Sequence, residues 1–235
     1  MKERTREKIA LIPARGGSKR ISGKNIKIFC GRPMIAWPIE AALESDLFER
    51  VIVSTDDDEI AAVARKWGAE IPFKRPAALA DEYTGTDAVF IHGLKALNIS
   101  MGYACCIYAT APLIQTEDLR RGLAILGNTP ATSVFSVTRF SAPIFRALQS
   151  SSNGRLDMFW PEYRMKRSQD LPEAWHDAGQ FYWVDVEKYL MEGRLFSSNS
   201  YSVKLPAWRV QDIDTEEDWS RAELIFNMLR NKNGS

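Results

Sequence analysis

Cysteine, histidine and long apolar runs are scarce in this chain. Only three of its 235 residues are cysteine and two are histidine. No CxxC or mixed Cys/His spacing occurs, and Cys105 and Cys106 are adjacent in an apolar run, so we expect buried, reduced thiols. The apolar run after the charged start ends at Pro13, too short for a signal peptide, and no stretch has the length of a membrane span. We therefore expect a soluble, cytoplasmic protein with no membrane partner.

An excess of charge of one sign is also absent. Lys and Arg number 31 against 30 Asp and Glu, a formal net charge of +1. Nucleic acids and anionic membranes bind basic surfaces, so the overall charge gives no reason to expect either as a partner. Hydrophobic residues make up 45% and charged residues 26%, which excludes a disordered or low-complexity chain.

Short, continuous apolar runs alternate with amphipathic segments along most of the chain. The runs predict buried strands at residues 9–12, 51–53, 104–108, 133–137 and 181–184. Apolar periodicity and terminal signals predict helices at 34–45, 60–67, 86–97 and 116–126, and a last helix that opens at Thr215. This alternation predicts an α/β fold whose mostly parallel sheet is covered by helices on both faces.

The alternation stops between about residues 140 and 180. Pro143, Pro161 and Pro172 occur there among scattered aromatic and basic residues, with no sustained period. The segment is too short for an independent core, so we expect an insertion of hairpin-like pieces. The sequence thus predicts one domain over residues 1–235 with an insertion at about 140–180.

A glycine-rich, basic loop follows the first predicted strand, from Ala14 to Asn25. Its glycines allow backbone amides to approach an anion, and its four basic residues would neutralise phosphate charge. The loop is not a P-loop, because five residues separate Gly17 from Gly23 and Asn25 stands where Ser or Thr is required. The loop predicts a phosphate site; the alternative is a solvated basic loop.

Two carboxylates occur near the end of the chain, at Asp212 and Asp214. On an extended segment their side chains point the same way, so both would face one site. Two hard oxygen ligands suit Mg²⁺, which keeps waters and also contacts substrate phosphates. The alternative is that Asp214 or its neighbours only cap the last helix.

Several of these motifs together resemble a known family. The matching segments are Ile12–Arg20, Lys24–Asn25, Val53–Asp56, Arg75–Pro76 with Leu79, Gly179 with Tyr182, and Asp212–Glu216. In this order they resemble the CMP-sugar-acid synthetases, cytidylyltransferases for sialic acid and related nonulosonic acids, and they span nearly the whole chain. The resemblance implies a Rossmann-like, GT-A-like nucleotidyltransferase fold, CTP and a nonulosonic acid as substrates, Mg²⁺ as cofactor and a homodimer.

The resemblance also implies roles for individual residues. Nucleotide binding would fall to Ala14, Arg15, Gly16, Lys24, Asn25, Arg75 and Thr86, with Arg75 near the cytosine and Thr86 near the sugar-phosphate portion. The expected catalytic residues are Arg15, Lys24, Asp212 and Asp214, of which the two aspartates would bind the metal.

The expected sugar is set by the segment Tyr108–Ile114. Sialic acid enzymes typically carry Gln-Pro-Thr-Ser-Pro-Leu-Arg there, whereas this segment, Arg167–Pro172 and His176–Trp183 resemble the pseudaminic acid branch. The sugar-binding residues implied are Tyr108, Arg167, Gln180 and Tyr182. Arg167 would fork onto the sugar carboxylate, with Arg164 or Lys166 able to share the task. Two alternatives stay open: a synthetase for legionaminic or sialic acid, and a nucleotide-binding protein of the same fold without turnover.

Overall fold

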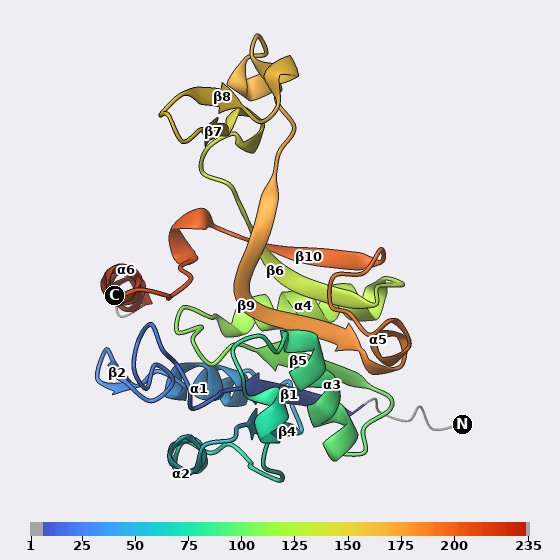
Figure 1. The fold of residues 1–235 in the computed structure, drawn as a ribbon. Coiled ribbons are helices and arrows are strands. Elements are labelled where there is room, and N and C mark those ends of the chain that lie inside the picture. The colour runs from blue at the N-terminus through green and yellow to red at the C-terminus, as the bar shows by residue number, and fades with distance from the viewer. Residues whose placement is uncertain (1–6, 234–235) are drawn as a thin grey trace.

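A six-stranded sheet forms the centre of the computed structural model, which describes residues 7–233. Its strands, in spatial order, are β10 (Ser200–Leu205), β6 (Ser133–Arg139), β9 (Trp175–Asp185), β5 (Tyr103–Ile107), β1 (Lys8–Pro13) and β4 (Arg50–Ser54). Strand β9 runs antiparallel to both of its neighbours, and the other pairs are parallel. The prediction of a mostly parallel sheet is therefore confirmed (Figure 1).

Helices cover both faces of this sheet, as predicted. The helices are α1 (Ala36–Glu44), α2 (Asp58–Lys66), α3 (Thr86–Ala96), α4 (Thr116–Asn128) and α5 (Val186–Glu192). Ala10 and Ile12 of β1 pack in one core with α1, α2 and α4, whereas Ile9 and Leu11 pack in the other with α3 and α5. Burial on both faces explains why the strand sequences are continuously apolar.

The predicted helix signals have their expected roles. Asp57 caps α2, because its carboxylate accepts hydrogen bonds from the backbone N–H groups of Glu59 and Ile60, both at 2.9 Å. The last helix, α6 (Glu216–Asn233), begins with a reciprocal capping box. In it the Asp218 N–H donates to the Thr215 hydroxyl at 3.2 Å and the Thr215 N–H donates to the Asp218 carboxylate at 2.9 Å.

Three strand features differ from the sequence prediction. Strand β10 is unpredicted because it is an edge strand in which only Val203 and Leu205 are buried. Strand β9 begins at Trp175, six residues before the predicted apolar run, because its first part alternates between covered and exposed residues. A small unpredicted hairpin, β2 (Ile28–Phe29) with β3 (Arg32–Pro33), packs against α6.

Residues 143–172, which we call the head, project away from the sheet beyond β6 and β9 (Figure 1). The head contains the strands β7 (Leu148–Ser150) and β8 (Leu156–Met158) and short 3₁₀ turns at Ile144–Arg146, Pro161–Tyr163 and Ser168–Asp170. Its interior is small: the Phe145 ring contacts the rings of Trp160 and Tyr163 at centroid distances of 5.7 and 5.0 Å.

The cysteines are unpaired, as expected from their spacing. Cys105 and Cys106 are buried, and burial raises the pKa of both thiols. Within residues 7–233, none of the helices combines the length and apolarity that crossing a membrane requires.

Candidate functional site

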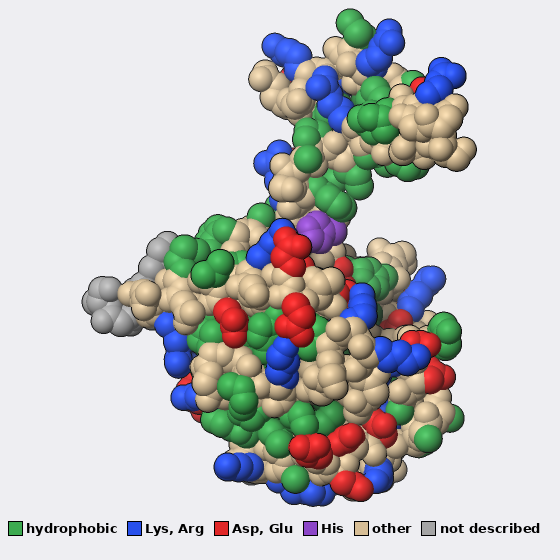
Figure 2. Space-filling model, turned by 60° about the vertical axis from the view of Figure 1, so that its left-hand side comes forward, with side chains coloured by type: hydrophobic (Ala, Val, Ile, Leu, Met, Phe, Trp, Pro, Cys, Tyr) green, Lys and Arg blue, Asp and Glu red, His purple; other side chains and the backbone are tan. Residues whose placement is uncertain are grey.

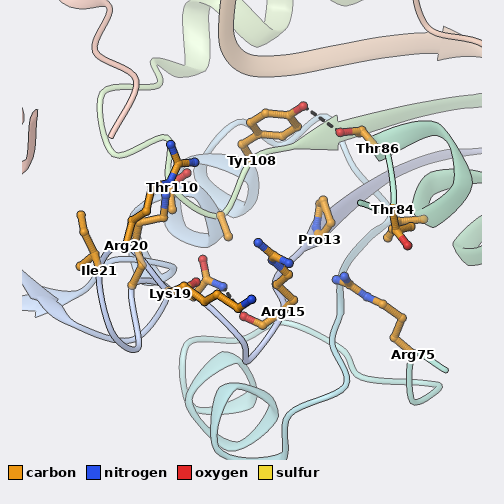
Figure 3. A pocket seen from close by; sticks show the side chains of 15 residues that line it. Pro13, Arg15, Lys19, Arg20, Ile21, Arg75, Thr84, Thr86, Tyr108 and Thr110 are labelled. Carbon is orange, nitrogen blue, oxygen red and sulfur yellow. Dashed lines mark hydrogen bonds between the residues drawn. The ribbon is translucent and has the colours of Figure 1, made fainter. Parts of the chain in front are cut away.

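A cavity of about 430 Å³ opens at the carboxyl ends of β1 and β5, the edge where ligands of α/β sheets bind. The residues that line it are Pro13, Arg15, Ser18, Lys19, Arg20, Ile21, Lys24, Asn25, Arg75, Thr84, Thr86, Val89, Tyr108, Ala109 and Thr110. Figure 3 shows Arg15, Arg20 and Lys19 on one side of this space and Arg75, Thr84 and Thr86 on another. The cavity is therefore strongly basic although the chain is nearly neutral.

The basic loop, residues 14–25, is fastened to the sheet by backbone groups. The Ala14 N–H donates to the Ser54 carbonyl at 2.9 Å, which continues the pairing of β1 with β4. The side-chain amide of Asn25, a buried residue, donates to the Arg15 carbonyl at 2.9 Å and closes the loop. Ala14 itself is buried, so its contribution to the site is backbone geometry.

Arg75 and Thr86 line the part of the cavity opposite the basic loop. Arg75 is only 4% exposed and donates through Nε to the Ser54 hydroxyl at 3.2 Å, and burial lowers the pKa of its guanidinium. Thr86 is the first residue of α3, and its hydroxyl shares a hydrogen bond of 2.8 Å with the Tyr108 hydroxyl (Figure 3). Burial raises the pKa of Tyr108, which keeps that hydroxyl protonated.

The acidic segment, residues 210–215, lies next to the basic loop. Lys24 Nζ donates to the Ile213 carbonyl at 2.6 Å and lies 3.4 Å from the Asp214 carboxylate. Arg20 pairs with the same Asp214 oxygen at 2.8 Å. The alternative that Asp214 or its neighbours cap the last helix is right for the neighbour Thr215, which caps α6 together with Asp218. The Asp214 carboxylate instead pairs with Arg20 and Lys24.

The two aspartates of the acidic segment influence each other. Partial loss of hydration raises the pKa of Asp212 above its usual value, and the charge of Asp214 raises it further. A divalent cation would relieve that repulsion. Within residues 7–233 no three His, Cys, Asp or Glu side chains cluster as metal ligands, so this donor set suits an ion that takes its other ligands from water and phosphate, as Mg²⁺ does.

Three predicted sugar-binding residues lie outside the cavity. Arg167 belongs to the head and pairs with Asp170 at 2.7 Å. Tyr182 is buried behind Tyr108, with ring centroids 5.2 Å apart, and its hydroxyl donates to Asp177. Gln180 is buried and turned toward Arg209 rather than toward the cavity.

Other residues line the cavity without having been predicted as site residues. Lys19 and Arg20 were recognisable as part of the basic loop and Thr110 as part of the segment Tyr108–Ile114, whereas Thr84 carries no signal in the sequence. His176 packs on the Phe140 ring at a centroid distance of 4.7 Å, which is a structural role.

Comparison with known proteins decides the family. Residues 9–180 match the profile of a family described as cytidylyltransferase. The chain belongs to the cytidylyltransferase family. In the fold of this chain, the basic loop lies at the edge of the sheet where the cavity opens.

Two curated members of the cytidylyltransferase family resemble the chain over most of its length. A pseudaminic acid cytidylyltransferase of Campylobacter jejuni is 40% identical over 94% of this chain and 96% of its own. A pseudaminic acid cytidylyltransferase and UDP-2,4-diacetamido-2,4,6-trideoxy-beta-L-altropyranose hydrolase of Helicobacter pylori is 37% identical over 87% of this chain and 40% of its own.

A solved structure shares the fold. It is a CMP:2-keto-3-deoxy-manno-octonic acid synthetase complexed with CTP, with a TM-score of 0.70 at 15% identity. The match covers 94% of this chain and 99% of that one. The nucleotidyltransferase fold expected from the sequence is thereby confirmed.

Proposed function

We propose that this cytidylyltransferase transfers CMP from CTP to the anomeric hydroxyl of pseudaminic acid and releases pyrophosphate. The observation that carries the proposal is the basic cavity beside a pair of carboxylates, in a chain 40% identical over 94% of its length to a pseudaminic acid cytidylyltransferase. The hydroxyl oxygen forms the new bond to the α-phosphorus, the bond to the pyrophosphate oxygen breaks, and the hydroxyl proton is released. Positioning and charge stabilisation provide most of the catalysis in such a reaction.

In this proposal the basic loop holds the triphosphate. Arg15 and Lys24 line the cavity as cations, and the loop that carries them is closed by the bond from Asn25 to the Arg15 carbonyl. Negative charge grows on the departing oxygens, so cations fixed in advance stabilise the transition state more than mobile ones. Arg75, held by Ser54 at the opposite part of the cavity, would face the base.

Asp212 and Asp214 are the proposed ligands of Mg²⁺. Bound there, the ion would supply Lewis-acid stabilisation of phosphoryl oxygens. The protein's own part is to keep the two carboxylates beside Lys24 and Arg20, which the contacts of Asp214 support.

The proposed sugar end of the cavity is marked by Tyr108. Its hydroxyl is bound to Thr86 and its ring is backed by Tyr182, so it forms a firm wall. Tyr108 stands where sialic acid enzymes typically carry glutamine, and this difference supports a sugar other than sialic acid.

Pyrophosphate release tests the function directly. The assay pairs CTP, UTP, ATP and GTP with pseudaminic, legionaminic and sialic acids, and we expect release with CTP and pseudaminic acid. Release with CTP and sialic or legionaminic acid alone would overturn the sugar assignment. No release with any pair would favour a nucleotide-binding protein without turnover.

The head supports a further part of the proposal, a homodimer. Its exposed apolar side chains are Leu148, Leu156, Phe159 and Met165, the last 85% exposed. Figure 2 shows hydrophobic side chains of the head lying among Lys and Arg side chains. A two-stranded hairpin has marginal stability on its own, and exposed apolar patches mark interfaces. We therefore propose that a second copy of the chain covers these apolar side chains of the head.

A dimer would also give Arg167 its proposed task. Because Arg167 lies outside the cavity of its own chain, we propose that it binds the sugar carboxylate in the partner's cavity. Arg167→Ala and Asp214→Ala chains, each inactive alone, should regain up to about a quarter of wild-type activity per subunit when refolded together, since random pairing leaves one intact site in half of the dimers. A monomer at micromolar concentration in analytical ultracentrifugation, or no regain on mixing, would overturn this part.

A further inference from the structure

The acidic segment has no regular secondary structure to hold it. Residues 210–215 lie between a 3₁₀ turn at Ala207–Arg209 and the start of α6. Their position beside the basic loop must therefore come from contacts with distant parts of the chain. Those contacts are concentrated at the two ends of the segment.

The end nearer α6 is fastened by Lys24 and by burial. Lys24 Nζ donates to the Ile213 carbonyl at 2.6 Å. The Ile213 side chain is buried among aromatic residues of α6 and the β2–β3 hairpin. Asp212 is left exposed beside this buried neighbour.

The entry end is fastened by a buried ion pair. Arg209 is 8% exposed, and its guanidinium pairs with the Asp118 carboxylate, which is 3% exposed and lies in the first turn of α4. Arg121 pairs with the other oxygen of Asp118 from a side chain that is 46% exposed. A buried ion pair contributes little net stability compared with apolar packing, and its better attested use is to fix one arrangement.

Gln180 of β9 fastens the same point through the backbone. Its Nε2 donates to the Arg209 carbonyl at 3.2 Å. Its Oε1 is buried and has no hydrogen-bond partner within residues 7–233. Because an unsatisfied buried oxygen costs stability, this side chain is poorly suited to a purely stabilising role.

We propose that Asp118, Arg209 and Gln180 form a positioning clamp that sets where the Asp212–Asp214 carboxylates stand relative to the basic loop. The link to metal binding rests on the proposed function, whereas the clamp itself does not. Without the clamp, the segment would keep its contacts at Ile213 and Asp214, whereas its entry end would keep only the partly buried Val210 side chain and the bond from Gln211 to Asp218 and would be freer to shift.

Hydrogen exchange tests the clamp without metal, nucleotide or turnover. The amides of Arg209 and Val210 are hydrogen-bonded within the 3₁₀ turn. In Asp118→Asn we expect peptides covering 207–215 to exchange at least about tenfold faster than in wild type, with peptides of β1 and α2 unchanged. Arg121→Gln is the matched control, because Arg121 touches the same carboxylate but not the acidic segment. Unchanged exchange in folded Asp118→Asn would overturn the clamp.

Manganese binding tests the consequence. With CTP present and no sugar, the Mn²⁺ dissociation constant measured by electron paramagnetic resonance should rise about tenfold in Asp118→Asn and in Gln180→Leu, and stay unchanged in Arg121→Gln. If Asp118→Asn does not fold, the Asp118→Leu/Arg209→Met pair replaces the ions by apolar groups and should fold. Wild-type exchange and Mn²⁺ affinity in that variant would overturn the clamp. Faster exchange in a protein whose wild type neither binds Mn²⁺ nor releases pyrophosphate would keep the clamp and reject the proposed function.

Discussion

The basic loop and the acidic segment are neighbours, yet they are held in different ways. The loop continues directly from β1 and is fastened by backbone groups and by the internal bond from Asn25 to Arg15. The acidic segment is held by side chains from α4, β9 and the loop itself. The position of the loop thus follows from the sheet, whereas that of the acidic segment depends on a few separate contacts.

This difference indicates which substitutions should impair function by moving the carboxylates and which should do so by changing the cavity. A substitution of Arg15 or Lys19 changes the charge or shape of the cavity but leaves the backbone bonds that anchor the loop. A substitution among the contacts of the acidic segment changes the position of carboxylates that it does not touch. The two classes of variant should therefore separate in experiments.

The largest effect is expected from the carboxylates themselves. Asp212→Ala or Asp214→Ala should lower turnover about a thousandfold, because metal stabilisation of phosphoryl charge is worth several kcal/mol. Asp214→Ala should also remove the ion pairs that Arg20 and Lys24 make with this carboxylate. Pyrophosphate release measures the loss and circular dichroism checks the fold. Glu216→Ala, which removes only an ion pair with Lys27, is the control, and near-normal activity of both aspartate variants with Mg²⁺ would contradict the assignment.

Lys24 joins the two regions, and its loss should have the next largest effect. Lys24→Met removes a cavity cation and the bond to the Ile213 carbonyl. We expect kcat to fall about a hundredfold, the usual effect of removing one preorganised donor. Lys27→Met is the matched control, since Lys27 binds Glu216 on the surface. Equal losses in the two variants would show that general charge, rather than position, matters.

Much of the loop side could be predicted because its signals are local. An apolar run followed by a glycine-rich basic stretch marks both β1 and the loop. On the acidic side, the one signal equally local is the Thr215–Asp218 box, which marks the start of α6. Each signal lies within a few residues of the feature that it predicts.

The acidic side could be predicted only in part. The spacing of Asp212 and Asp214 is visible in the sequence, but the pairing of Asp118 with Arg209 joins residues 91 positions apart and depends on how α4 packs. Gln180 was predicted to bind the sugar because its motif resembles the family's, whereas the pleat of β9 turns it to Arg209. Which distant residues pair, and toward which side a strand residue points, depend on tertiary packing and cannot be read from the local sequence.

The loop side can be disturbed through its backbone at Gly16. A Cβ added there would lie 2.5 Å from the Asp57 carboxylate that caps α2, whereas one added at Gly17 meets nothing within 4 Å. Gly16→Ala should therefore lower the free energy of unfolding by about 1–3 kcal/mol, as overpacking does, and Gly17→Ala should change it little. Urea denaturation compares the two variants, and Asp57→Ser, which keeps a capping hydroxyl, should partly restore Gly16→Ala. Equal stabilities would mean that the loop is not pressed against α2.

The smallest effect is expected from breaking the single hydrogen bond between the Tyr108 and Thr86 hydroxyls, which lie in the wall of the cavity. Tyr108→Phe removes the hydroxyl that binds Thr86 while the ring stays against Tyr182. One neutral hydrogen bond contributes about 1 kcal/mol, so kcat/KM for the sugar should fall about fivefold. Thr86→Val should do the same, and the double variant should be no worse than either alone, because both changes break one bond. Additive losses would show that each hydroxyl contacts substrate separately. A loss as large as the roughly hundredfold one expected for Lys24→Met would show that the cavity wall also depends on single side chains, and the contrast between the two regions would fail.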